Sequence, residues 1–379
     1  MAHMEKTLIK TNIEAAMIAR GLTQTALAEA LGVSKEAVSQ WMKNKSFPRP
    51  DKLLRLGKLL SLSFNDLVES IDQHAPVVAF RKMKGTKTTT DHIKKAQEMG
   101  LFLKPLVNYL SYETLEVPPV LKSPSCDYEY LQQVAQKVRS DIHVGGSDKV
   151  DFTHLIRRFG ELQTTIIPVL WGNKVKHQNA THIYLPDSQT TWVYLNLDTN
   201  IHDFKFWMAH ELGHCLSPSL KGDEAEDFAD AFAGALLFPQ SLAKSAYASV
   251  VNKLSNIDKV KTMVSIANEN VISPYTVFLQ INKYAEKMGR QTFTFDSLLH
   301  SQTTNFNKKF PLMSKALLGC DSDAIDPKDY LLKAAEAFDT AFFDILKKYL
   351  HESKKGFGYI QSVMDIPLLD AQSIYAELI

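Results

Sequence analysis

The sequence predicts an α+β chain that is mostly helical, and three observations support this fold class. Apolar residues recur at helical spacing through most of the 379 residues, strand-like runs are confined to about residues 166–197, and proline clusters at 48–50 and 117–124 interrupt the pattern. The predicted parts are a five-helix domain at 5–71, a helical connector at 72–126, a domain with a small sheet at 127–289, and a helical region of unknown role at 290–379.

The composition is that of an ordinary globular chain, with 45% hydrophobic and 22% charged residues. The net charge is +1, so any contact with nucleic acid must come from a local basic face. No apolar run approaches the roughly 20 residues of a membrane span, and no signal peptide opens the chain. Three scattered cysteines suit a reducing compartment. We therefore expect a cytoplasmic protein with no membrane partner.

Five short helices are expected before residue 70. The first ends at Gly21. Thr23 and Ser34 are placed to cap the second and third helices through their hydroxyl groups, and Gly32 supplies the turn between those helices. A leucine-rich fourth helix follows Pro50, and a short fifth helix completes the pattern.

The second and third of these helices, joined by the glycine turn, constitute a helix-turn-helix. The segment from Leu22-Thr23-Gln24 to Val38-Ser39-Gln40-Trp41 resembles the Xre/phage-repressor class. The resemblance implies that Gln24 binds a phosphate and that the third helix offers polar side chains to base edges. The expected DNA-contact residues are Gln24, Ser34, Lys35, Glu36, Ser39, Gln40, Lys43, Asn44 and Lys45.

The alternative for this domain is a small helical docking module that binds no DNA. Lys35, Ser39 and Gln40 face outward and are polar where a docking surface would be apolar, which favours DNA. Glutamine can pair with adenine in bidentate fashion, and glutamate can accept a hydrogen bond from cytosine. Because the domain is only slightly positive, we expect modest affinity per monomer and a homodimer on a two-fold-symmetric double-stranded DNA operator.

The connector contains one expected amphipathic helix at about 91–112 and a basic cluster from Arg81 to Lys87. That cluster is interpreted as a solvated linker, with contact to DNA backbone as the alternative. Beyond the connector, helices are expected at about 128–140 and 152–159, and strands at 166–170, 182–185 and 191–197. The last two strands flank Pro186-Asp187-Ser188-Gln189 and predict a hairpin.

The motif that carries chemistry is His210-Glu211-Leu212-Gly213-His214, within a stretch expected to be helical from 203 to 216. On a helix the two histidines lie one turn apart, so both imidazoles leave the same face. This suits two corners of a catalytic zinc site, which takes three protein ligands and keeps the fourth position for water. Glu211 is then placed to accept a proton from that water. The alternative is a surface helix with two solvated histidines.

A third ligand is expected from the helix that begins near Asp223. Glu226 and Asp230 share a face of it. Glu226 is the expected ligand, and Asp230 is expected to accept a hydrogen bond from the second ring nitrogen of a ligating histidine. Glu224 and Asp230 are alternative ligands. Acids in a first turn also complement the helix dipole, but this does not explain an acid at 230 within an apolar stretch.

His210-Glu211-Leu212-Gly213-His214 and Phe232-Ala233-Gly234-Ala235-Leu236-Leu237-Phe238-Pro239 together resemble the ImmA/IrrE family of metallopeptidases. The resemblance implies a zincin-like, thermolysin-like domain that binds Zn²⁺ through His210, His214 and Glu226, with Glu211 as the catalytic base. It implies a zinc metalloendopeptidase that cleaves a partner repressor or antitoxin-like protein, with activity confined to one partner or dependent on a trigger. An edge strand near the metal would hold the substrate backbone.

Two histidines near the expected strands, His177 and His182, are interpreted as structural or exposed, with approach to the metal as the alternative. Leu331 to Leu350 predicts one amphipathic helix packed in the core, with an oligomer or sensor interface as the alternative. The sequence thus predicts a DNA-binding regulator with a peptidase domain. Two rival functions are a non-catalytic regulator whose metallopeptidase-like domain senses a ligand or partner, and an antitoxin-like protein that neutralises a toxin.

Overall fold

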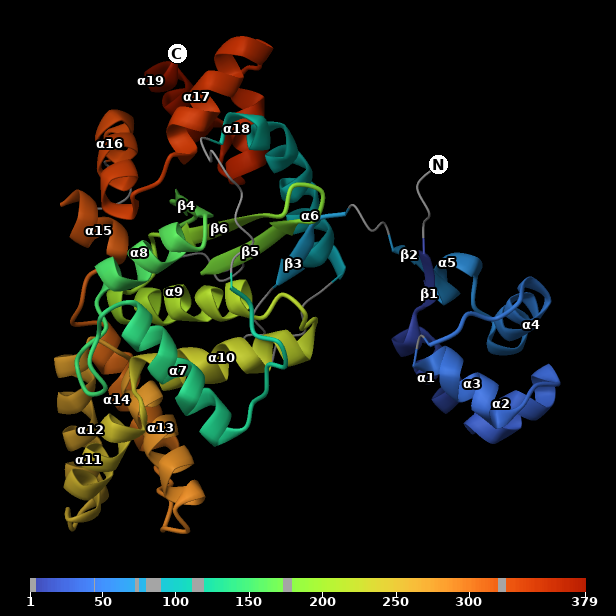
Figure 1. Cartoon of the computed structure of the whole chain (residues 1–379), viewed down its shortest axis with the longest axis horizontal. Coiled ribbons are helices and arrows are strands. Elements are labelled where there is room, and N and C mark those ends of the chain that lie inside the picture. The colour runs from blue at the N-terminus through green and yellow to red at the C-terminus, as the bar shows by residue number, and fades with distance from the viewer. Residues whose placement is uncertain are drawn as a thin grey trace. The chain divides into compact units, whose positions relative to one another are not determined.

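The computed structural model describes residues 5–43, 45–71, 75–79, 90–110, 119–172, 179–319 and 325–379. The chain divides into two compact units, Met1–Ala75 and Pro76–Ile379 (Figure 1). Within the described ranges, none of the helices combines the length and apolar composition that a membrane span requires.

The first unit contains the five predicted helices. They are α1 (Lys10–Ala19), α2 (Gln24–Leu31), α3 (Lys35–Met42), α4 (Pro50–Leu60) and α5 (Phe64–Leu67). The Thr23 hydroxyl accepts a hydrogen bond from the backbone of Ala26, and that of Ser34 accepts one from Ala37. Gly32 ends α2 with φ at 61°, a left-handed conformation that glycine adopts without a steric penalty.

Two strands of the first unit were not predicted. β1 (Glu5–Leu8) and β2 (Val68–Ile71) pair antiparallel, with Leu8 opposite Val68. Both of these residues are buried in the core of this unit, together with Ile13, Leu31 and Leu56. Each strand has only four residues, and its partner lies about sixty positions away in the sequence. The local pattern therefore carries no signal for the pairing.

The second unit is built on a four-stranded sheet in the order β3-β5-β6-β4. Its strands are β3 (Val77–Ala79), β4 (Thr164–Val169), β5 (Ala180–Leu185) and β6 (Thr190–Asn196). β5 and β6 form the predicted antiparallel hairpin, and β4 runs parallel to β6. α9 and α10 lie on one side of the sheet, and α16 to α18 lie on the other. Both faces are covered, so β4 is buried along its whole length.

The segment predicted as a connector supplies part of this unit. β3 pairs antiparallel with β5, and α6 (Thr90–Leu103) packs on both strands. Gly100 of α6 lies so close to Pro76 that a side chain would overlap the proline ring. The single helix predicted at 91–112 is wrong, since a 3-10 helix, η1 (Lys104–Tyr109), replaces its second half around Pro105, which has no backbone N–H to donate. The cluster Arg81 to Lys87 lies outside the described residues.

A layer of helices surrounds the sheet and continues beyond it: α7 (Tyr128–Asp141), α8 (Phe152–Glu161), α9 (Ile201–Leu216), α10 (Asp223–Leu237), α11 (Gln240–Val251), α12 (Asn256–Asn270) and α13 (Pro274–Lys287). α9 and α10 pack very closely. A Cβ atom at Gly213 would lie 3.0 Å from the Cα of Ala229 and 3.2 Å from the ring of Phe232. The absence of a side chain at residue 213 therefore sets the separation of the two helices.

The C-terminal helices are α14 (Asp296–Asn307), α15 (Met313–Leu318), α16 (Pro327–Phe338), α17 (Phe342–Ser353), α18 (Phe357–Met364) and α19 (Leu368–Leu378). The single helix predicted at 331–350 is wrong. Asp339 adopts a left-handed conformation with φ at 45°, and the Thr340 hydroxyl donates a hydrogen bond to the carbonyl of Ile166. As predicted, most of the apolar stripe is in the core, where Phe338 and Phe342 share one cluster with the sheet and α9.

Candidate metal centre

α9 carries the His-Glu-Leu-Gly-His motif through the interior of the second unit. The Asn200 side chain caps its first turn by accepting a hydrogen bond from the backbone of His202. His210 is 0% exposed, Glu211 3% and His214 4%. A surface helix with two solvated histidines is therefore ruled out, because both imidazoles are removed from water.

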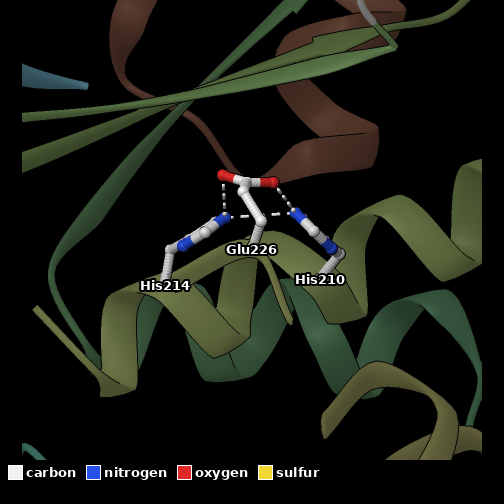
Figure 2. A group of neighbouring side chains, drawn as sticks. All are labelled: His210, His214 and Glu226. Carbon is white, nitrogen blue, oxygen red and sulfur yellow. Dashed lines mark hydrogen bonds and ion pairs between the residues drawn. The ribbon is translucent and has the colours of Figure 1, made fainter. Parts of the chain in front are cut away.

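α10 brings the Glu226 carboxylate between the two imidazoles (Figure 2). Its oxygens lie 3.4 Å from Nε2 of His210 and 3.3 Å from Nε2 of His214, and the two Nε2 atoms are 3.1 Å apart. Ligand atoms at the corners of a tetrahedron with zinc–ligand bonds of about 2.05 Å lie about 3.3 Å from one another. The observed spacing therefore fits three corners of a zinc site.

Two buried carboxylate oxygens around this group support a cation there. Oε2 of Glu211 is buried and forms no hydrogen bond with the residues that the structure describes, and Oε2 of Glu226 is buried with a long contact of 3.4 Å to Nε2 of His210. Burying an acceptor without a partner is costly unless a cation or a proton satisfies it. The donor set of two histidines and one glutamate is one that catalytic zinc sites use.

The ionisation of the group follows from burial and close contact. For Glu226, burial raises the pKa, but hydrogen bonds to His210 and His214 outweigh this and lower it to about 2. For His210, burial lowers the pKa, but hydrogen bonds to Asp230 and Glu226 raise it to about 9. Burial raises the pKa of Glu211 to about 8. A cation bound between these groups would favour the neutral imidazoles and the carboxylate.

Asp230 lies one helical turn beyond Glu226 and orients a histidine. Its Oδ1 atom is 2.9 Å from Nδ1 of His210, so the ring donates a hydrogen bond there and leaves Nε2 free to point at the centre. The structure thus places Asp230 at the position that the sequence predicted for it. Glu224, the other alternative ligand, is exposed and does not belong to the group formed by His210, His214 and Glu226.

A further histidine, His182, lies near the ligands, a position that is the alternative interpretation of the sequence. His182 lies on β5, is 5% exposed, and its ring centre is 5.7 Å from that of His214. Its Nε2 atom is buried and forms no hydrogen bond within the described residues. The sequence left this position as the alternative and could not decide it, because nothing in a six-residue strand indicates which helix will lie beneath it. His177 lies outside the described residues.

The cysteine next to the second histidine serves packing. Cys215 is buried, and its sulfur lies 3.7 Å from the hydroxyl of Thr164. Burial raises the pKa of its thiol to about 12, so the thiolate required for metal binding or nucleophilic attack is not favoured. This placement assigns Cys215 to packing and not to ligation.

Most of the residues predicted to contact DNA lie on α3 or directly beside it in the sequence, and Gln24 begins α2. Ser34, Lys35, Glu36, Gln40, Lys43 and Lys45 are exposed, and Gln24 and Ser39 are half-buried. Val38 and Trp41 fill the opposite face of α3 and are buried in the core. The Ser34 hydroxyl is already used to cap α3. Asn44 lies outside the described residues.

Comparison with known proteins identifies the first unit. Residues 13–67 match the family model described as helix-turn-helix. This match covers well under half of the chain, and it makes the first unit a DNA-binding helix-turn-helix domain of the kind that serves transcription regulation. The match says nothing about the second unit.

Among solved structures, the chain is similar to the crystal structure of Bacillus thuringiensis PlcR in complex with the peptide PapR7 and DNA. The identity is 9%, the match covers 81% of this chain and 94% of that chain, and the TM-score is 0.15. So low a TM-score carries no argument about the second unit or its ligands. No curated protein matches the chain.

Proposed function

We propose that the chain is a DNA-binding transcription regulator whose second unit is a zinc-dependent endopeptidase of the ImmA/IrrE type. The observation that supports this most directly is the buried group of His210, His214 and Glu226, with donor atoms 3.1, 3.3 and 3.4 Å apart. Its spacing suits Zn²⁺, and Glu211 follows His210 on the same helix. The zincin-like assignment of the domain is part of this proposal.

In such a centre the metal ion and the protein side chains would each supply part of the chemistry. A Zn²⁺ ion held by the three ligands would supply a Lewis acid for hydrolysis of a peptide bond. Glu211 would accept a proton from the attacking water and pass it to the leaving amine. In the metal-free protein burial raises the pKa of Glu211 to about 8, and a cation beside it would favour the carboxylate form that accepts the proton. Asp230 keeps the His210 ring in the orientation that this arrangement requires.

The substrate in this proposal is a partner repressor or antitoxin-like protein, and the enzyme acts on that partner alone or after a trigger. The helix-turn-helix domain would hold a homodimer on an operator, so that the partner is met on DNA. Localisation in the cytoplasm belongs to the same proposal. These points rest on the resemblance of the motifs to the ImmA/IrrE family and not on the match at residues 13–67.

One observation favours the rival function, a non-catalytic regulator whose second unit binds a ligand or partner. β5 carries His182 beside the ligands, and β3 pairs with it along His182, Ile183 and Tyr184. That side of β5 is therefore occupied by the chain itself. A substrate that adds a strand to the sheet there would have to displace β3.

Metal content distinguishes a metal centre from a cluster of buried polar residues. Purified protein should contain about one zinc per chain by elemental mass spectrometry, and His210→Ala and Glu226→Ala should each lose it. His202→Ala is the matched control, since His202 is equally buried on α9 but packs against the rings of Phe306 and Phe310. Zinc retained in the two ligand variants, or absent from the wild type even after zinc addition, would contradict the proposed site.

Catalysis is tested separately by Glu211→Gln, which removes the proton acceptor and keeps the size of the side chain. Protein N-termini should be labelled in host cells that express either the wild type or this variant. New termini that depend on Glu211, from one or a few proteins, would support the peptidase. If the zinc-loaded wild type and the variant give the same termini under all conditions in which the operator is regulated, the non-catalytic regulator is the better description.

A further inference from the structure

We propose that His182 is a further catalytic residue of the second unit, whose Nε2–H donates a hydrogen bond to the carbonyl oxygen of the scissile peptide as negative charge develops on it. This inference rests on the proposed peptidase function. It assigns a role to a residue that neither the sequence motifs nor the comparison with known proteins single out.

The position of His182 is the first argument. It lies on β5, which packs on α9, the helix that carries two of the ligands. Its ring centre is 5.7 Å from that of His214, with the two planes inclined at 43°. The ring therefore belongs to the wall of the site formed by the sheet.

The second argument is its unsatisfied nitrogen. Nε2 of His182 is buried and has no hydrogen-bond partner among the described residues. A buried polar atom without a partner costs about 1–3 kcal/mol, native proteins retain few of them, and a catalytic role is one reason to retain one. A neutral imidazole carries one N–H and donates a hydrogen bond without placing a positive charge beside the cation.

The third argument excludes His182 as a fourth metal ligand in this arrangement. His210, His214 and Glu226 have donor atoms that all lie within 4.8 Å of one another, and His182 is not a member of that described group. Four ligands of a tetrahedral zinc site would lie about 3.3 Å apart. Three protein ligands leave the fourth position of such a site for substrate or water, and the His182 ring lies beside His214 without belonging to the group. A donor beside the ligands is suited to stabilise an oxygen that occupies the open position.

The experiment uses full-length protein loaded with Co²⁺ and titrated with acetohydroxamate, an anion that binds open metal positions through oxygen and is followed by the visible absorption of the metal. His182→Phe keeps an aromatic ring and removes the donor. It should weaken acetohydroxamate binding about 10- to 100-fold, the range of a hydrogen bond to a charged group, with unchanged metal stoichiometry. His182→Gln, which restores an N–H donor, should recover part of the affinity.

The matched control is His202→Phe. His202 is also a buried histidine whose pKa burial lowers, to about 4, but its ring centre lies 4.6 and 4.2 Å from those of Phe306 and Phe310. This variant should bind acetohydroxamate as the wild type does. Once a Glu211-dependent cleavage is known, His182→Phe should lower kcat by about 100-fold or more and leave KM nearly unchanged, as loss of an oxyanion donor does.

The outcomes separate the two proposals. If the wild type binds metal and acetohydroxamate and His182→Phe binds both equally well, the role of His182 is wrong and the metal centre stands. If His182→Phe loses the metal, His182 is a ligand and the site is closed, which overturns this inference. A wild type that takes up no Co²⁺ or Zn²⁺ refutes the proposed function itself, and the role of His182 with it.

Discussion

Replacing Gly213 by alanine tests whether the close approach of α9 to α10 builds the metal centre. The added Cβ would lie 3.0 Å from Cα of Ala229, 3.2 Å from the ring of Phe232 and 3.3 Å from Cβ of Ala229. Carbon atoms in contact lie about 3.5–4.0 Å apart, so the backbone of α10 must retreat by roughly 0.5 Å. Overpacking of this kind costs about 1–3 kcal/mol.

Gly160→Ala is the matched substitution. Gly160 also lies inside a helix, α8, but a Cβ there meets nothing within 4 Å. Both variants gain about 1 kcal/mol from the helix propensity of alanine, so this term cancels in their comparison. Gly213→Ala should therefore be about 1–3 kcal/mol less stable than Gly160→Ala. It should also bind zinc more weakly, because Glu226 moves with α10.

The assay is urea unfolding of the metal-free protein, followed by tryptophan fluorescence. The two units can unfold separately, so the measurement must report on the second unit alone. Trp41 is the tryptophan of the first unit, and a Trp41→Phe background leaves Trp171, Trp192 and Trp207 as probes. Equal midpoints for the Gly213 and Gly160 variants, at equal m-values, would refute the reasoning that close helix packing restricts residue 213.

Three further predictions follow from the site and the DNA-binding domain. Asp230→Asn should fold normally but bind zinc about 10- to 100-fold more weakly in a competition titration, and unchanged affinity would show that orientation of His210 does not matter. Because His210 has a raised pKa, its contribution to the stability of EDTA-treated protein should be present below about pH 6.5 and lost as pH rises towards 9. Urea unfolding at pH 6, 7.5 and 9 checks this, and a stability that does not change with pH would contradict it. Gln40→Ala should relax operator specificity by about 1–3 kcal/mol in mobility-shift titrations, whereas Lys43→Ala should weaken all sequences alike and reduce the salt dependence.

The zinc affinity of the site is expected to change with pH in the direction opposite to the stability contribution of His210 in the metal-free protein. Protons compete with the metal for the imidazole nitrogen, so zinc affinity should rise with pH over the window in which the metal-free protein loses stability. Isothermal titration at the same three pH values would show this. Glu226 stabilises the fold over a different pH range. Because its pKa is lowered to about 2, its contribution to stability is lost only as pH falls below about 4.5.

The sequence alone predicted those features whose causes are interactions between residues close together in the chain. The helical caps at Thr23 and Ser34 involve atoms three residues apart, and the structure contains both hydrogen bonds. The spacing of His210 and His214 depends only on helical periodicity, which is why their shared face could be expected. Two predicted helices, at 91–112 and at 331–350, were wrong because each continued past a break in the helix, near Pro105 and at Asp339. Pro105 offered a signal that should have stopped the helix, whereas Asp339 ends α16 because the next residue bonds to β4.

The sequence by itself determined the helix-turn-helix, the motif on α9 and the candidate carboxylates on α10, because each follows from spacing along one element. Only the tertiary structure decided what depends on contacts between distant elements. Those contacts selected Glu226 and not Glu224, since packing at Gly213 fixes which face of α10 meets α9. They also placed β3 on the edge of β5 and His182 beside the ligands. No local pattern encodes such neighbours, because they are set by how the whole core packs.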